Sequence, residues 1–98
     1  MGKITLTTDT PSKAVEVLRE VLETEAMRVN YSLQIAKKRM RRFETKYGIS
    51  SGKFMREGSA EDLKGKDMEY VEWAGEYKLF LRLKERLTVL KSIEHVTH

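Results

Sequence analysis

Three carboxylates that share one helical face are the first candidates for chemistry in this sequence. Glu69, Glu72 and Glu76 are spaced three and four residues apart, so a helix places them on the same side. Carboxylate-bridged metal bundles add a Glu-x-x-His pair on facing helices. The two histidines, His95 and His98, are instead in the last four residues. We therefore expect a salt-bridged face, with no metal site and no other cofactor.

Catalysis is not indicated elsewhere in the chain. Ser50 and Ser51 are potential nucleophiles, but no histidine or lysine is placed to act as their base, and helix capping explains them. The segments GKFMREG and KGKD lack the spacing of a glycine-rich phosphate loop. An enzyme needs an acid and a base together in a pocket. The sequence therefore predicts no catalytic residue and a protein that is not an enzyme.

A strongly basic stretch, KKRMRRFETKYG, occupies residues 37–48, with six basic side chains and one acid. Residues 59–78 contain six acids and three lysines, which gives that segment a net charge of −3. The basic stretch ends the first expected helix and the acidic segment begins the second, so each complements a helix dipole. In an antiparallel hairpin the two segments also lie side by side, which predicts ion pairs between them.

A helical wheel divides the basic side chains into two groups. One group flanks the apolar seam within reach of Glu69, Glu72 and Glu76, and comprises Lys37, Arg39 and Lys46. The other points away from the seam and is the candidate nucleic-acid contact: Lys38, Arg41 and Arg42. The residues between them that could stack on bases fall on the seam, so we expect them in the core: Met40, Phe43 and Tyr47.

The first half of the chain predicts one long helix after an extended start. KITLTT within residues 1–10 alternates like a strand, but a lone strand needs an edge to pair with, so a loose tail is equally consistent. Thr10 is a potential cap and Pro11 suits the first helical position. No glycine or proline interrupts residues 11–47, and Gly48 suits the left-handed position after a helix.

The second half predicts a turn that contains a short helix, followed by a second long helix. Residues 48–66 form the turn, where Ser50 or Ser51 caps a short helix bearing Phe54 and Met55 that stops at Gly58. SAEDLKGK reads as a polar loop. Asp67 then caps a helix over residues 67–94, and the last residues, HVTH, are expected to fray.

Both long segments have an apolar stripe at spacings of three and four residues, which predicts an all-α antiparallel hairpin forming a single domain. A two-helix hairpin buries little surface, and small domains are marginally stable. The first helix is also longer than the second, which leaves the start of its seam uncovered: Val15, Leu18 and Leu22. We expect either a homodimer that closes a four-helix arrangement or a different protein partner.

The overall composition fits one small domain of 98 residues with a net charge of +4. There is no cysteine, which excludes disulfides and thiolate metal sites and suits a cytoplasmic location. No apolar run reaches the length of about 18 residues that a membrane span requires, and we expect no signal peptide at the start. A membrane partner is therefore not expected.

An aromatic patch on the second helix surrounds Trp73, with Tyr70, Tyr77 and Phe80. Core packing is the favoured interpretation, but a two-helix core rarely covers a tryptophan completely, and half-buried aromatics often anchor interfaces. Phe54 has the same two interpretations. We therefore predict a partner-binding set that combines these aromatics with nearby cations: Arg41, Arg42, Phe54, Trp73 and Tyr77.

The string FETKYGISSGKF at residues 43–54, Gly58, EWAGEY at residues 72–77 and RLKERL at residues 82–87 resemble a class of small prokaryotic antitoxins encoded beside ribonuclease-type toxins. The resemblance covers about residues 33–90. It implies that the functional positions are Phe43, Tyr47, Gly48, Ser51, Phe54, Trp73 and Tyr77. Gly52-Lys53 replaces a usually acidic pair, and the following turn is less acidic than in that class.

This resemblance implies a non-catalytic inhibitor that covers the active cleft of a toxin with its helical hairpin. The N-terminal segment would add to a sheet edge of the toxin. Two alternatives remain: a small basic helical dimer that binds nucleic acid, and a purely structural homodimer.

Overall fold

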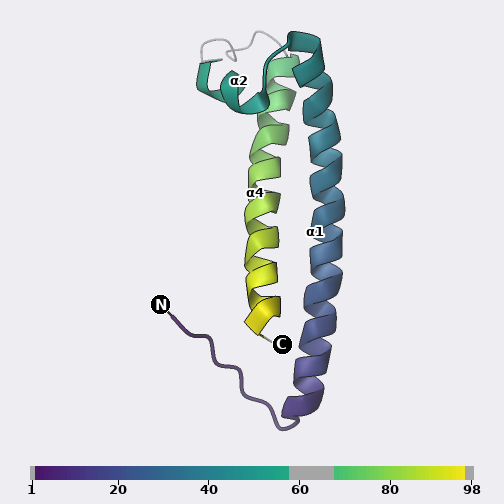
Figure 1. Ribbon diagram of the computed structural model, residues 1–98, viewed down its shortest axis with the longest axis vertical. Coiled ribbons are helices and arrows are strands. Elements are labelled where there is room, and N and C mark those ends of the chain that lie inside the picture. Colours follow the sequence, from purple (N-terminus) through teal and green to yellow (C-terminus); the bar gives the residue numbers. More distant parts are fainter. Residues whose placement is uncertain (1, 58–67, 97–98) are drawn as a thin grey trace.

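The protein is a long helical hairpin with a short helix at its closed end (Figure 1). The computed structural model describes residues 2–57 and 68–96, with the backbone alone for residues 94–96. Its elements are α1 (Pro11–Tyr47), α2 (Ser51–Glu57) and α4 (Met68–Val96), and no strand occurs in these ranges. The predicted all-α hairpin is confirmed.

Helix α1 has the predicted bounds and spans 37 residues, about 55 Å at 1.5 Å per residue. Gly48 ends it in the left-handed conformation at φ 65°, and its N–H donates to the Glu44 carbonyl. Pro11 begins it as expected, but the Thr10 side chain makes no capping hydrogen bond. The prediction of a side-chain cap at Thr10 is therefore wrong. The Thr10 N–H itself donates to Thr8 Oγ1 at 3.2 Å.

Helix α2 begins at Ser51, in agreement with the predicted cap at Ser50 or Ser51. The Ser50 hydroxyl accepts a hydrogen bond from the Lys53 N–H at 3.1 Å, which makes Ser50 the cap. Ser51 is buried and has a different role, described below. The predicted stop at Gly58, the polar loop over residues 59–66 and the Asp67 cap lie outside the described residues.

Helix α4 runs antiparallel to α1, and three ion pairs between the helices fix the register. Arg39 pairs with Glu76 and Lys46 with Glu69 near the closed end, while Glu25 pairs with Arg86 farther along. The helix is longer than predicted, because it continues to Val96 rather than ending near Glu94.

The core consists of two separate clusters along this seam. The closed-end cluster joins α1, α2 and α4 around Met40, Phe54, Trp73 and Ala74. The open-end cluster joins α1 and α4 through Leu22, Val29 and Leu90, with Leu18, Leu83 and Leu87 packed against them. Leu33 and Ala36 of α1 are also buried.

The uncovered part of the α1 seam is therefore shorter than expected. Leu22 is buried with Leu90, and Leu18 is partly buried against the same cluster, because the antiparallel register brings Leu90, a residue inside the predicted second helix, against this part of α1. Of the three residues predicted to need a cover, Val15 remains exposed. The seam itself does not require a dimer to bury Leu18 and Leu22.

The N-terminal segment forms no strand in the described residues and leaves the start of α1 as an extended chain (Figure 1). Of the two expectations for KITLTT, the tail is the one observed. The whole molecule measures 57 × 26 × 19 Å, with a radius of gyration of 18.6 Å. A compact chain of this length would have about 13 Å. None of the helices in the described ranges combines the length and apolar character of a membrane span.

Candidate interaction surfaces

The closed end is built around Trp73, whose side chain is fully buried, at 0% exposure. The Phe54 ring from α2 stacks on it almost parallel, with 4.0 Å between centroids and 3° between planes. Phe43 and Tyr47 from α1 also stack with it, at 5.6 and 5.7 Å. One indole thus ties three helices together, and large buried aromatic area dominates the energetics of a core this small.

A polar relay completes the burial of this indole. Trp73 Nε1 donates to Ser51 Oγ at 2.7 Å, and Ser51 Oγ donates to Glu44 Oε2 at 2.7 Å. The Ser51 N–H donates to the same carboxylate oxygen at 2.9 Å. The Ser51 hydroxyl therefore satisfies the indole N–H, and one carboxylate of α1 satisfies both the hydroxyl and the N–H of Ser51, so none of these donors is left without a partner.

The structure places the residues of the predicted partner-binding set at different depths. Trp73 and Phe54 are core residues, and neither ring is available at the surface. Three helices meet at this end, so the indole receives more cover than a two-helix seam provides. Tyr77 is half-buried beside the same cluster, while Arg41 and Arg42 are exposed on α1.

The basic and acidic segments pair as the helical wheel predicted at two positions. Arg39 Nη1 lies 3.2 Å from Glu76 Oε1, and Lys46 Nζ lies 2.6 Å from Glu69 Oε2. Hydrogen bonds from Lys46 and from the Tyr47 hydroxyl lower the pKa of the Glu69 carboxyl. Lys37 and Glu72, the other two predicted members, form no ion pair with a described side chain.

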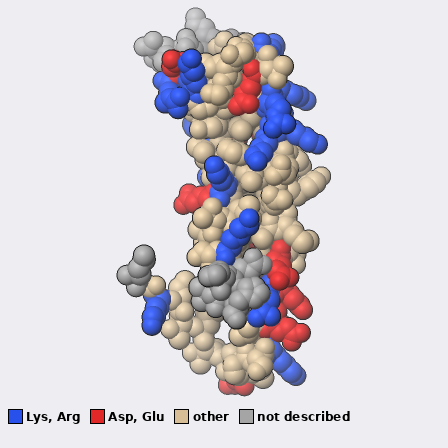
Figure 2. Space-filling model, viewed as in Figure 1, with Lys and Arg blue, Asp and Glu red and all other residues tan. Residues whose placement is uncertain are grey.

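The second basic group stays on the outer surface of α1, as predicted. Lys38, Arg41 and Arg42 are exposed, and together with Thr45 they line one shallow hollow. None of the three cations forms an ion pair with the side chains described for residues 2–57 and 68–93. Figure 2 shows the gathering of basic side chains along the upper part of α1.

A third ion-pair centre lies toward the open end and was not foreseen from the sequence. Glu25 accepts hydrogen bonds from Arg28 on its own helix and from Arg86 on α4, at 2.7 to 2.9 Å. These two guanidinium groups lower the pKa of the Glu25 carboxyl from 4.5 to about 2. The carboxylate is thus a polar clamp between the two long helices.

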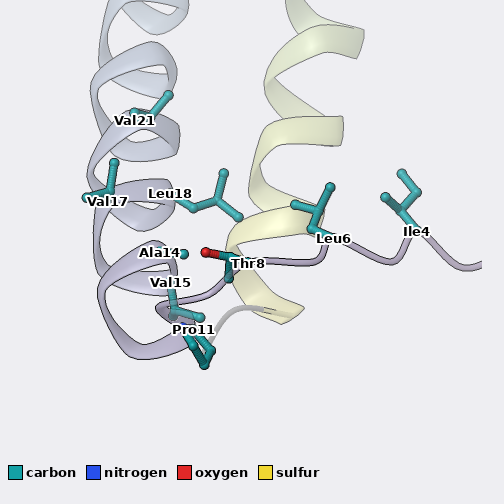
Figure 3. Close-up of a pocket in the computed structure, with 9 residues that line it drawn as sticks. All are labelled: Ile4, Leu6, Thr8, Pro11, Ala14, Val15, Val17, Leu18 and Val21. Carbon is teal, nitrogen blue, oxygen red and sulfur yellow. The ribbon is translucent and has the colours of Figure 1, made fainter.

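An apolar groove forms where the N-terminal segment meets the start of α1 (Figure 3). Its volume is about 570 Å³, and its apolar walls come from both elements. Ile4 and Leu6 of the segment are 87% and 71% exposed, and Val17 and Val21 of α1 are 57% and 56% exposed. The other lining residues are Thr8, Pro11, Ala14, Val15 and Leu18. A small helical protein thus presents a continuous apolar surface to solvent at its open end.

The potential catalytic and metal residues do not assemble into a site in the described part of the chain. Ser50 and Ser51 both serve helix α2, and two of the three clustered glutamates are held by Arg39, Lys46 and Tyr47. Among residues 2–57 and 68–96, no group of three potential metal ligands lies close together.

Two features were missed from the sequence. Glu44 was counted only as the single acid of a basic stretch, although its position one turn before Gly48 places it within reach of the α2 start. Val17 and Val21 fall outside the seven-residue series of the seam. Their spacing of four residues was the signal for a second apolar stripe.

The chain was compared with protein-family models, with curated proteins and with solved structures. None of the three comparisons gives a match. The antitoxin resemblance therefore remains a prediction based on the motif residues quoted above.

Proposed function

We propose that this protein is a non-catalytic interaction module that acts as an antitoxin-like inhibitor, binding and occluding a ribonuclease-type toxin in the cytoplasm. The observation that supports this proposal best is the apolar groove at the open end. Contiguous exposed apolar surface on a small protein marks an interaction site. The motif residues at 43–54 and 72–77 resemble those of antitoxins, and this resemblance is the reason for proposing a ribonuclease-type toxin as the partner.

The groove suits a protein partner by its construction. Ile4 and Leu6 are two residues apart on an extended segment, so both side chains face the same way. A segment of this kind can add as a strand to a sheet edge, while Val17 and Val21 offer a helical ridge beside it. The partner would cover both elements together.

The test is co-purification of the tagged protein with proteins of its native host, followed by an activity assay on the captured partner. A single small protein at near-equal stoichiometry should appear, and it should degrade RNA when freed and stop when this chain is added back. Capture of no partner, or of a partner whose ribonuclease activity is unaffected, would contradict the proposal.

A matched pair of variants links that result to the groove. Val17→Ser with Val21→Ser should abolish capture, whereas Val89→Ser, on α4 and 51% exposed, should not. If the Val17/Val21 double variant and the Val89 variant capture the partner equally well, the partner binds elsewhere.

The second candidate function is nucleic-acid binding by a small basic helical dimer, favoured by the hollow that Lys38, Arg41 and Arg42 line. Binding to labelled duplex or single-stranded oligonucleotides should then fall steeply with salt, and triple substitution of these residues by alanine should remove it. Affinity that is independent of salt, or undetectable, would exclude this candidate.

A further inference from the structure

The outer face of α1, directed away from α4, is divided into three zones. Its first part has Lys13 at the helix start and then three acids, Glu16, Glu20 and Glu23, and its last part is basic, with Lys38, Arg41 and Arg42. All seven side chains are exposed. Figure 2 shows acidic side chains along the lower part of the α1 edge with a basic one at its lower end, basic side chains along the upper part, and other residues between them.

The middle zone is apolar. Met27 and Tyr31 are each 70% exposed and are one helical turn apart. They lie on the opposite side of the helix from Leu22, Val29 and Leu33, so they do not contribute to the hairpin core. Because they are neighbours on the helix surface, the two side chains form one small apolar patch between the charged zones.

We propose that this outer face of α1 binds the same face of a second copy. The two α1 helices are antiparallel, and the two-fold axis passes between them at the level of residue 29. This arrangement places Met27 against Tyr31 of the other copy, and Tyr31 against its Met27. The sulfur of methionine packs favourably on aromatic rings. In the same register Glu20 faces Lys38 of the other copy, and Glu16 faces its Arg42.

The helical spacing agrees with this register. Glu20 and Met27 are seven residues apart and belong to one series, and Tyr31 and Lys38, also seven apart, belong to a second. The second series is displaced from the first by four residues, the separation of Met27 and Tyr31. Two interleaved series with a repeat of seven residues define the contact stripe of a helix pair. An isologous two-fold contact requires that the partner of each residue also lie on the same surface, and these series satisfy that condition.

A second copy fits this face better than an acidic partner such as nucleic acid. A polyanion would be attracted to Lys38 and Arg42 but repelled by Glu16 and Glu20 on the same face. A second copy in antiparallel orientation neutralises both zones. A parallel copy would oppose acid to acid and base to base. The inference does not depend on the toxin partner, because the groove at the open end is a different surface.

Charge-swap variants test the pairing directly, by sedimentation equilibrium over a range of protein concentrations at low and moderate salt. Glu20→Lys and Lys38→Glu should each weaken dimerisation by about tenfold or more, because like charges then meet twice in each dimer. The double variant should dimerise within about threefold of the original protein, because both pairs are restored with reversed sign. Lys91→Glu, at an exposed position on α4, makes the same charge change as Lys38→Glu and should have no effect on dimerisation.

Mixing provides an independent readout. The two single variants should associate with each other more tightly than either does with itself. Circular dichroism should show the same helix content for every variant, because all these side chains are exposed. A monomer at all concentrations, single variants that dimerise normally, or a double variant as weak as the singles would overturn the proposal.

Discussion

The two ends of the hairpin differ in how their apolar residues are used. At the closed end three helices surround Trp73, and its indole N–H is satisfied through Ser51 and Glu44. At the open end two helices share a smaller cluster, while Ile4, Leu6, Val17 and Val21 face solvent. The difference indicates that the closed end holds the fold together, whereas the open end leaves apolar surface exposed, which is the surface that the proposed partner would cover.

Loss of the central indole should have the largest effect on stability. Trp73→Ala removes the ring that joins α1, α2 and α4 and should lower the free energy of unfolding by about 3–5 kcal/mol. The measurement is urea unfolding followed by circular dichroism. Tyr31→Ala, at an exposed position, should change it by less than about 0.5 kcal/mol in dilute solution. Similar effects at the two positions would contradict the central place of Trp73 in the core.

The relay beneath the indole should have the next largest effect. Ser51→Ala leaves the Trp73 N–H buried without its acceptor, which should cost about 1–3 kcal/mol. The neighbouring Ser50→Ala removes only the cap of α2 and should cost about 1 kcal/mol. Chemical denaturation of both variants gives the comparison. A cap variant that is the more damaging of the two would mean that the relay contributes little.

The Glu25 clamp should have a smaller, pH-dependent effect. Because its pKa is lowered from 4.5 to about 2 in the folded protein, the clamp stabilises the fold above pH 4.5. That contribution is lost as the pH falls from 4.5 toward 2. The difference in urea midpoint between the original protein and Glu25→Gln should therefore shrink over this range. Glu23→Gln, an exposed acid without a described partner, should show no such trend.

The groove should have the smallest effect on stability, although its loss should abolish partner capture. Val17→Ser with Val21→Ser alters side chains that are more than half exposed, so unfolding should change by less than about 0.5 kcal/mol per site. Thermal unfolding of the double variant measures this directly. A loss of several kcal/mol would place both valines in the core and remove the groove as a binding surface.

Much of the architecture was predictable from local signals. The bounds of α1 follow from Pro11, Gly48 and the absence of any breaker between them, and the ion pairs of Arg39 and Lys46 follow from helical geometry. These features depend on residues close in sequence, or on the simple alignment of two antiparallel helices.

The features that were not predicted depend on three-dimensional packing. The depth of Trp73 depends on how α2 folds back over the hairpin, which spacing along one helix does not specify. The burial of Leu22 depends on the register that brings Leu90 against it, and Thr10 was predicted to be a cap although its side chain makes no capping hydrogen bond. The Glu44 contact likewise requires the position of α2 relative to α1.

Hydrogen–deuterium exchange resolved to single amides, on dilute protein without a partner, tests the division of roles between the two ends most directly. Amides around Met40 and Trp73 should exchange only through global unfolding, whereas those of residues 11–21 should exchange through local opening at much lower free energy. Equal protection along the whole of α1, or weaker protection at the closed end, would contradict the account.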